Sequence, residues 1–268
     1  MKVAAVQMTS GADYHQNMSV AHDLIGEAAL KGARLVLLPE MFACIGVTNQ
    51  VSLAESYFTK EKLLATLGKW AKEKQVYIIA GSIPFSSDEL DRVYAACFVF
   101  SPSGDVIAQY NKIHLFDVDV DDEKGSYRES NTFVSGQTPE QVDIDGNPLG
   151  LSICYDLRFP ELYQHYQKNN CVMITVPSAF TYETGKKHWE VLLRARAIET
   201  QCFVIAANQV GLHEDGRQTW GHSMIVSPSG EVLSTVADET NSIAIADLDL
   251  GEMNLIRSAM PIKNHKRL

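Results

Sequence analysis

The sequence predicts an α/β fold built as a four-layer α-β-β-α sandwich with an internal pseudo-twofold repeat. Two observations lead to this prediction. Short apolar runs alternate along the chain with segments of helical periodicity, which is the pattern of buried strands joined by helices. Two stretches of the chain also resemble two later stretches, which predicts two similar sheets with helices outside them. With 268 residues, 46% of them hydrophobic, the chain can bury such a core as a single domain over residues 1–268.

The predicted strands are short and apolar on both faces, as strands covered by other layers are. They span residues 3–8, 34–39, 76–81, 150–154, 172–177 and 203–208. Between several of them, apolar residues recur at helical spacing and predict helices over residues 16–30, 60–74, 160–168 and 185–201. Strands that alternate with helices in this way indicate an α/β architecture.

The internal repeat rests on two matched pairs of segments. "FVFSPSGDVIAQY" (98–110) and "MIVSPSGEVLSTV" (224–236) are both apolar runs joined by Ser-Pro-Ser-Gly, which suits a hairpin turn. "KGARLVLLPEMFA" (31–43) and "KNNCVMITVPSAF" (168–180) both place a buried strand before a proline and an aromatic residue three positions on. An old duplication explains both pairs, and so does chance similarity between common turns.

Charge and cysteine content exclude several classes of protein. The net charge of -10, with scattered Lys and Arg, lacks the basic stripe that tracks phosphates, so we expect no nucleic-acid and no membrane partner. No apolar run reaches membrane-spanning length, and the N-terminus turns polar too soon for a signal peptide. The five cysteines form an odd set without a C-x-x-C pair, which fits neither a disulfide framework nor a zinc site. We therefore expect reduced thiols in a cytoplasmic protein.

Three reactive side chains lie at the ends of predicted strands, where sites form in α/β sheets. Glu40 follows the strand 34–39, Lys112 follows the first hairpin, and Cys154 ends the strand 150–154. Each has an ordinary structural explanation, because a buried cysteine fills a core and a Glu or Lys beside a strand is commonly exposed. Together they supply a thiol nucleophile, a carboxylate that accepts its proton and a cation for an oxyanion, which are the parts needed for acyl transfer.

Two further points concern this set. A nearby Lys112 would favour the thiolate form of Cys154. Histidine is the alternative general base, and the candidates are His114, His188 and His222.

The longest irregular segment, residues 115–139, is too polar to be core and is long enough to be a functional loop.

The segments "LLPEMF", "NKIHLFD" and "ICYDLRFPEL" resemble, in this order, the three catalytic segments of the nitrilase superfamily of carbon-nitrogen hydrolases. The resemblance runs from "AAVQM" near the start to "DLDL" near the end. It implies a Glu40-Lys112-Cys154 triad, hydrolysis of an amide or nitrile without metal or cofactor, and a homodimer built on the helices beside the nucleophile. It also implies a second glutamate, and Glu129 matches that position, where it orients Lys112 or the substrate or forms a loop salt bridge. The backbone N–H of Tyr155 is then expected to hold the oxyanion with Lys112.

Other segments, such as "KIHLFDVDV" and "WGHSMIVSPSGEV", are similar to the Nit branch of this superfamily, which contains deaminated glutathione amidase and ω-amidase. This resemblance implies a small-molecule amide substrate that carries a carboxylate, cleaved at the distal amide of an α-keto acid. Arg158 can grip a carboxylate with two hydrogen bonds, or it can pair with Asp156 or Glu161. The segment "DDEKGSY" (121–127) departs from the Pro-Gly that is usual there, which bears on the size of the pocket.

Three other functions remain open from the sequence. A nitrilase and an N-carbamoyl amine or amino-acid hydrolase would use the same triad on another substrate. A noncatalytic binding protein on the same fold would be expected to lack one triad residue, and all three are present.

Overall fold

The computed structural model describes residues 1–120 and 125–267. Its first sheet has seven strands in the order β17-β1-β2-β3-β5-β4, with β6 beside β5. The bounds are β1 (Lys2–Gln7), β2 (Leu35–Leu37), β3 (Tyr77–Ile79), β4 (Ile83–Ser86), β5 (Val93–Phe100), β6 (Val106–Asn111) and β17 (Ser242–Asp247). Strands β1, β2 and β3 are parallel, while β17 and β5 run antiparallel to their neighbours β1 and β3.

The second sheet has six strands in the order β16-β15-β12-β11-β10-β9. The bounds are β9 (Gln141–Ile144), β10 (Asn147–Leu151), β11 (Met173–Ser178), β12 (Phe203–Asn208), β15 (Met224–Val226) and β16 (Val232–Thr235). Two short hairpins lie outside both sheets, one formed by β7 (Asp117–Asp119) and β8 (Ser126–Arg128), the other by β13 (Val210–Leu212) and β14 (Gln218–Trp220).

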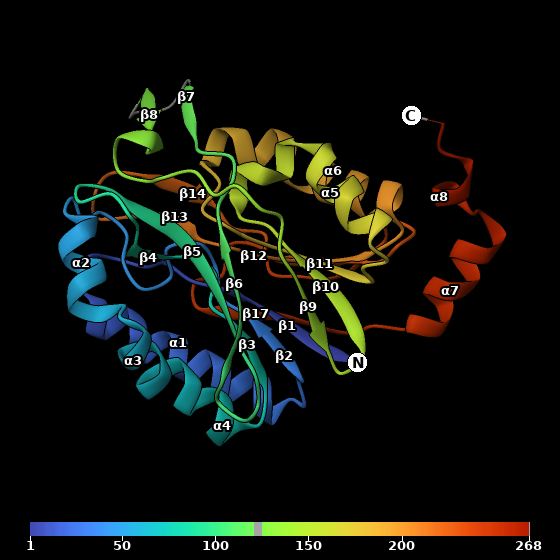
Figure 1. Cartoon of the computed structure of the whole chain (residues 1–268), viewed down its shortest axis with the longest axis horizontal. Coiled ribbons are helices and arrows are strands. Elements are labelled where there is room, and N and C mark those ends of the chain that lie inside the picture. The colour runs from blue at the N-terminus through green and yellow to red at the C-terminus, as the bar shows by residue number, and fades with distance from the viewer. Residues whose placement is uncertain (121–124, 268) are drawn as a thin grey trace.

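Helices cover the two sheets from outside. Their bounds are α1 (Tyr14–Leu30), α2 (Gln50–Tyr57), α3 (Lys60–Leu63), α4 (Lys69–Lys74), α5 (Pro160–Lys168), α6 (Tyr182–Thr200), α7 (Leu250–Ala259) and α8 (Ile262–His265). Figure 1 shows α1, α3 and α4 along one side of the strands, and α5 and α6 along the opposite side.

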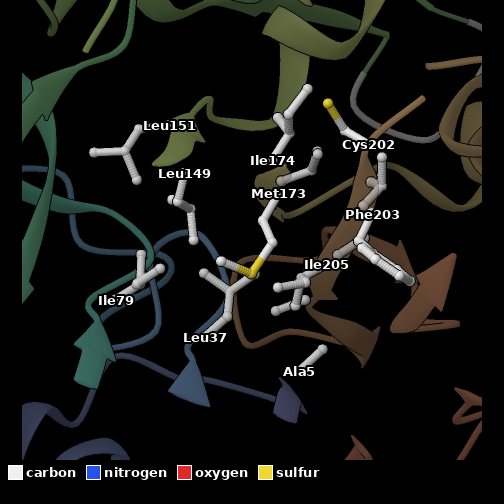
Figure 2. Close-up of a cluster of buried hydrophobic side chains, with 14 of the residues drawn as sticks. Ala5, Leu37, Ile79, Leu149, Leu151, Met173, Ile174, Cys202, Phe203 and Ile205 are labelled. Atoms are coloured by element: carbon white, nitrogen blue, oxygen red, sulfur yellow. The ribbon is translucent and has the colours of Figure 1, made fainter. Parts of the chain in front are cut away.

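Alternation along the strands decides which layers touch. Successive side chains of a strand point to opposite faces, so Leu37 packs into the core between the sheets, while Val36 packs against α1. Figure 2 shows Leu37 and Ile79 of the first sheet facing Leu149 and Met173 of the second. The predicted α/β class is therefore confirmed, with the two sheets packed face to face between helices.

The two sheets share one pattern of strand pairing, although β4 of the first sheet has no counterpart in the second. Reading β17, β1, β2, β3, β5 and β6 across the first sheet gives the same sequence of parallel and antiparallel pairs as β9, β10, β11, β12, β15 and β16 in the second. The two Ser-Pro-Ser-Gly turns also match, because Ser101 and Ser227 each bond their neighbouring serine, Ser103 and Ser229, at 2.7 Å. These matches favour a duplication over chance, and the twofold axis itself stays a prediction.

Two predicted elements differ in the structure. The helix predicted over residues 60–74 is α3 and α4 joined by a π-helical turn, Leu64–Gly68. A Cβ at Gly68 would lie 2.5 Å from the backbone oxygen of Gly104, so the turn is in close contact with the first hairpin. The strand predicted over residues 150–154 ends at Leu151, which leaves Cys154 outside the sheet.

The segment 115–139 contains β7, β8 and a short 3₁₀ helix, Glu129–Asn131. Part of its departure from the usual Pro-Gly, at residues 121–124, lies outside the described residues. No helix in the described part of the chain has the length and apolar character needed to cross a bilayer.

Candidate active site

A buried cluster of one cation and two carboxylates lies where the two sheets meet. Lys112 Nζ is 2.8 Å from Glu40 Oε1 and 2.9 Å from both carboxylate oxygens of Glu129. The side chains of Lys112, Glu40 and Glu129 are 2%, 6% and 15% exposed, so water screens their charges little. Glu129 is therefore not a surface loop salt bridge but a direct partner of Lys112.

The backbone fixes both carboxylates. Glu40 lies beyond the end of β2, and its Oε2 accepts a hydrogen bond of 2.8 Å from the backbone N–H of Ala179, which follows β11 of the other sheet. The backbone N–H of Phe116 donates to Glu129 Oε2 at 2.6 Å. Each carboxylate thus accepts one hydrogen bond from the backbone and one or more from Lys112. These bonds restrict the rotation of the three side chains.

Cys154 begins a 3₁₀ helix, Cys154–Arg158, and is 8% exposed. Its φ is +47°, a left-handed conformation that a residue with a Cβ adopts only under strong local constraint. The prediction that it ends a strand is wrong, because the chain turns after Leu151 to present the cysteine. The N–H of Tyr155 lies in the first turn of this helix, where amide groups have no partner within the helix.

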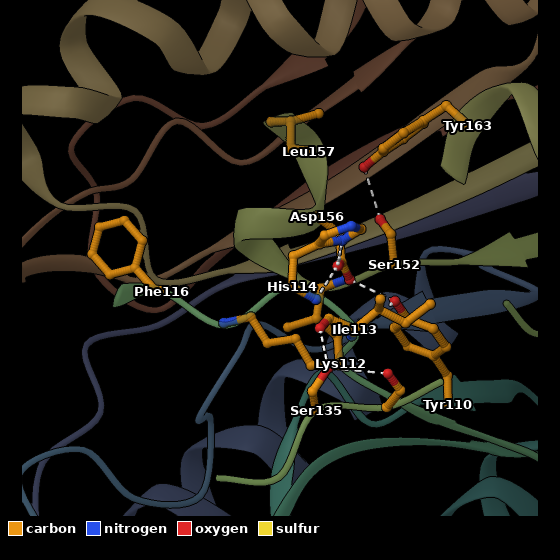
Figure 3. A network of polar contacts seen from close by, with 12 residues as sticks. Tyr110, Lys112, Ile113, His114, Phe116, Ser135, Ser152, Asp156, Leu157 and Tyr163 are labelled. Atoms are coloured by element: carbon orange, nitrogen blue, oxygen red, sulfur yellow. Dashed lines mark hydrogen bonds and ion pairs between the residues drawn. The ribbon is translucent and has the colours of Figure 1, made fainter. Parts of the chain in front are cut away.

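Asp156 provides that constraint. Its side chain is fully buried and accepts hydrogen bonds from Ile153 N at 2.8 Å and from Tyr110 Oη at 2.7 Å. It also contacts His114 twice, at the backbone N (3.0 Å) and at Nδ1 (2.7 Å). Tyr110 and His114 lie two positions before and two positions after Lys112 in the sequence. Figure 3 shows both side chains beside Asp156. One carboxylate therefore connects the segment that carries Lys112 to the turn that carries Cys154.

Electrostatics set the protonation of the cluster. Burial alone would lower the pKa of Lys112, but the charges of Glu129, Glu40 and Cys154 raise that pKa well above its ordinary value. Burial raises the pKa of Glu129, Lys112 opposes this rise, and the charge of Glu40 adds to it. Lys112 consequently stays cationic at neutral pH.

The thiol of Cys154 is protonated in the resting state. Burial and, next, the charge of Glu40 raise its pKa well above the ordinary value. Lys112 acts in the expected direction, since it lowers that pKa, but its effect is smaller. If this thiol acts as a nucleophile, it needs a base that accepts its proton.

A cavity of about 610 Å³ contains all four predicted catalytic side chains, Glu40, Lys112, Glu129 and Cys154, in its wall. Tyr155 and Arg158 line it as well. The cavity is large enough for a small organic molecule. The sequence-predicted site residues thus lie together in one place.

Arg158 does not form the ion pair that was its alternative explanation. Asp156 is occupied by the contacts described above, and the recorded polar contact of the Arg158 guanidinium is Nη1 to His188 Nδ1 at 3.2 Å. Its Cζ lies over the ring of Phe180 at 5.3 Å. Within the described residues, then, no carboxylate lies within ion-pair distance of this guanidinium, which remains available for a ligand.

None of the three candidate histidine bases lines the cavity among the described residues. His114 bonds Asp156 and stacks on Phe159 with ring centroids 3.7 Å apart. His188 contacts Arg158, and His222 stacks on Trp220 at 4.2 Å. Glu40 contacts Lys112 and also interacts with the thiol of Cys154, whose pKa it raises.

Sequence reasoning missed two groups of this site. The first is the backbone N–H of Ala179, which follows β11 of the second sheet and donates to Glu40. The sequence feature that could have indicated it is the proline-aromatic pattern shared by residues 31–43 and 168–180. The role of Asp156 was missed because its partners Tyr110 and His114 lie more than forty positions away in the sequence.

Comparison with known proteins identifies the family of the chain. A family model described as carbon-nitrogen hydrolase matches residues 2–258. The chain is 44% identical to a deaminated glutathione amidase of Synechocystis sp., over 98% of this chain and 97% of that protein. It is 37% identical to omega-amidase NIT2 of Mus musculus, over 99% of this chain and 95% of that protein.

Solved structures of similar fold include two Nit proteins. The C. elegans NitFhit protein matches with a TM-score of 0.91 and 35% identity over 99% of this chain, which spans 65% of that larger chain. Saccharomyces cerevisiae Nit3, described as a member of branch 10 of the nitrilase superfamily, matches with a TM-score of 0.89 and 28% identity, over 100% of this chain and 97% of that one. From these matches, and from the motifs around Glu40, Lys112 and Cys154, the chain belongs to the carbon-nitrogen hydrolase family.

Proposed function

We propose that this protein is a cysteine amidohydrolase that cleaves the distal amide of a small α-keto acid amide, of the deaminated glutathione kind, through a thioester intermediate. The observation that carries the proposal is the cavity in which Cys154 meets the Glu40-Lys112-Glu129 cluster, with Arg158 in the same wall. The names of the relatives from Synechocystis and Mus musculus support an amide substrate.

In the first half-reaction, Glu40 accepts the proton of the Cys154 thiol as sulfur bonds to the amide carbon. Lys112 Nζ and the N–H of Tyr155 donate to the oxygen that becomes negative. When the carbon-nitrogen bond breaks, the leaving nitrogen takes the proton from Glu40. Ammonia or an amine departs, and the acyl group stays on Cys154 as a thioester.

In the second half-reaction, water replaces the departed amine. Glu40 accepts a proton from this water as its oxygen bonds to the thioester carbon, and the same donors hold the oxyanion. The carbon-sulfur bond then breaks, and Cys154 recovers a proton from Glu40. The product is a carboxylic acid, and every catalytic group returns to its starting state.

Glu129 keeps the cation in place during both halves. It holds Lys112 Nζ at 2.9 Å through both oxygens, while Phe116 N fixes the carboxylate in turn. A lysine with two buried acidic neighbours keeps its proton, as its raised pKa indicates. Lys112 therefore keeps its proton throughout the reaction. It stabilises the oxyanion by its positive charge and a hydrogen bond.

Arg158 is proposed to bind the carboxylate of the α-keto acid half. Its guanidinium is planar, permanently charged and suited to a bidentate contact. The relative named omega-amidase NIT2 favours a second candidate function, hydrolysis of α-ketoglutaramate or α-ketosuccinamate, which present the same keto acid to Arg158.

Further parts of the proposal concern the whole protein. Residues 1–268 are proposed to form one catalytic domain that acts as a homodimer in the cytoplasm. The exposed apolar residues Val191 and Ile198 on α6 support the dimer. The five cysteines, all described as free and buried, suit a reducing compartment.

Release of ammonia or amine over a panel of amides tests the function. The panel contains deaminated glutathione, α-ketoglutaramate and simple aliphatic amides, with nitriles and N-carbamoyl compounds as the competing classes. We expect the keto acid amides to have the highest kcat/KM. Faster turnover of a nitrile, or release of CO2 from an N-carbamoyl substrate as the main activity, would contradict the proposal.

A further inference from the structure

A small cavity lies beside the large one and shares the carboxylates of Glu40 and Glu129 with it. Its volume is about 10 Å³, which is the space that one water molecule needs. Gln50 and Ser82 add polar side chains to a wall that is otherwise mainly apolar. Gln50 is the first residue of α2, which packs against β4 (Figure 1), and Ser82 directly precedes β4. Polar groups from several elements therefore meet around a space of molecular size.

Gln50 has a buried acceptor without a partner. The residue is 5% exposed, and its Nε2 donates to Val47 O at 2.6 Å. This bond fixes the orientation of the amide, because the reversed amide would place two carbonyl oxygens against each other. Its Oε1 then bonds no group among the described residues. Since a buried amide oxygen without a hydrogen bond destabilises the fold, a ligand that donates to this oxygen would stabilise it.

Ser82 and the carboxylates can supply the other contacts of a water molecule. The backbone N–H of Met41 donates to Ser82 Oγ at 3.1 Å, which leaves the hydroxyl hydrogen of Ser82 to donate. A carboxylate has about four acceptor positions, whereas Glu40 accepts one hydrogen bond from Lys112 and one from the N–H of Ala179. A water molecule can thus accept from the serine and donate to the amide oxygen and to a carboxylate. Three hydrogen bonds are typical of a buried water.

We propose that the small cavity binds one water molecule, which bridges Gln50, Ser82 and the carboxylate of Glu40. The water site does not depend on the proposed function, whereas its consequence for catalysis rests on that function and deepens it. Glu40 accepts the proton of Cys154 in the proposed mechanism, so the orientation of its carboxylate affects the rate. The water adds a further hydrogen bond to this carboxylate, and Gln50 is a positioning residue that acts on Glu40 through it.

A monovalent cation is the competing occupant, because the two carboxylates attract positive charge. Two observations favour water. Lys112 already supplies a cation to Glu40 and Glu129. In addition, no group of three or more His, Cys, Asp or Glu side chains that could hold a metal ion occurs in the part of the chain that the structure describes.

A high-resolution crystal structure of the whole chain tests the site directly. We expect density for one water molecule, with contacts of about 2.7 to 3.2 Å to Gln50 Oε1, Ser82 Oγ and Glu40. Gln50→Met keeps the length of the side chain and removes the amide, so its crystals should lack this water. Absence of the water from the wild type, or a water that does not contact Glu40, would overturn the inference.

Gln167→Met is the matched control. Gln167 on α5 is also buried, its Nε2 donates to Glu199 O at 2.8 Å, and its Oε1 likewise bonds no group among the described residues. The two substitutions therefore remove the same groups from the protein, and Gln167→Met should keep the water beside Gln50. Replacing sodium and potassium salts by choline chloride separates the two occupants. The density and the activity should not change, and loss of either would assign the site to a cation.

Kinetics with the best substrate of the panel test the positioning role. Gln50→Met should lower kcat by about tenfold, the order of one hydrogen bond to a charged group, with little change in KM because the water does not touch the substrate. Ser82→Ala removes another partner of the water and should show the same effect. Gln167→Met should keep the wild-type kcat although it loses similar thermal stability.

Two kinetic results would contradict the positioning role. An unchanged kcat in Gln50→Met would show that the water does not affect Glu40. A raised KM with unchanged kcat would show that Gln50 contacts the substrate in the large cavity, which it also lines. If the wild type hydrolysed no keto acid amide, the proposed function would fail, and the crystal structures would still decide whether the water site exists.

Discussion

The thiol of Cys154, the proposed nucleophile, is protonated at rest, and this makes its reactivity dependent on pH. Because its pKa is raised, the fraction of thiolate at neutral pH is small and grows about tenfold per pH unit. We expect alkylation of Cys154 by iodoacetamide, localised by mass spectrometry, to keep accelerating beyond pH 9. A plateau near neutral pH would contradict the protonated resting state. Cys154→Ala should abolish turnover, because no other group forms the thioester.

Glu40 and Lys112 should be as necessary as the nucleophile. Glu40→Gln keeps the shape of the side chain and removes the base, and Lys112→Met keeps the length and removes the cation. Since residues that act as a unit lose most of the activity singly, each change should lower kcat by about 1,000-fold or more. Steady-state kinetics measure this, and retention of a tenth of the activity, a loss of only ~1.4 kcal/mol, would show that the group is misassigned.

Arg158 should determine the preference of the enzyme for substrates that carry a carboxylate over neutral amides. Lysine cannot form the planar two-bond contact of arginine, so Arg158→Lys should raise KM for a keto acid amide far more than for a neutral amide. A bidentate charged contact is worth roughly 2 to 4 kcal/mol, or on the order of 30- to 1,000-fold in kcat/KM. Equal losses on both substrates would exclude the carboxylate contact.

At the scale of elements, the end of β6 and the 3₁₀ helix of Cys154 are joined through Asp156. Tyr110→Phe removes one of its donors, and should lower kcat by about tenfold with little change in KM, since the substrate is not touched. Tyr163→Phe is the control. It removes a buried hydrogen bond to Ser152 Oγ, 2.9 Å long, that does not involve Asp156.

Both tyrosine variants should lose thermal stability, about 1 kcal/mol for the neutral bond of Tyr163 and about 1.5 to 3 kcal/mol for the bond of Tyr110 to a carboxylate. Tyr110→Phe also gives up a longer contact of 3.4 Å from the N–H of Ile113. The positioning role predicts that only Tyr110→Phe also loses kcat. If the two variants lose stability and kcat to the same extent, the connection through Asp156 is structural and does not position the catalytic groups.

The same elements show how far the sequence predicts the molecule. Apolar runs and helical periodicity located the inner strands of both sheets, the two Ser-Pro-Ser-Gly hairpins and helices α1, α5 and α6, because these patterns follow from burial on known faces. They did not locate β4, β9 or β17. They could not locate the turn at Cys154, whose left-handed φ depends on the contact of Asp156 with residues of another sheet. The π-helical turn before Gly68 was missed for the same reason, since its close contact with Gly104 is tertiary.

At the scale of the whole molecule, α6 leaves an apolar face uncovered. Val191 and Ile198, two turns apart on this helix, are 68% and 47% exposed. The proposed homodimer would cover them. Sedimentation should give about twice the mass of the 29.7 kDa chain, and Val191→Asp should shift it toward the monomer.

Leu90→Asp is the control for this change. Leu90 is 98% exposed and lies between β4 and β5, away from α6 in the sequence, so its substitution should leave the sedimentation of the dimer unaltered. A monomeric wild type, or a Val191→Asp variant that remains dimeric, would contradict an interface built on α6.

The pairing of β1 with β17 has a consequence for how the chain is made. β1 is hydrogen-bonded on one side to β17, from Lys2 with Asp247 to Gln7 with Ser242. A ribosome therefore releases β1 long before its partner exists, roughly 10 to 50 seconds earlier at ordinary elongation rates. During that time an apolar strand edge is open to pairing with other nascent chains. Completion of the first sheet therefore waits for the synthesis of β17, and shielding of the open edge of β1 until then would prevent its pairing with other chains.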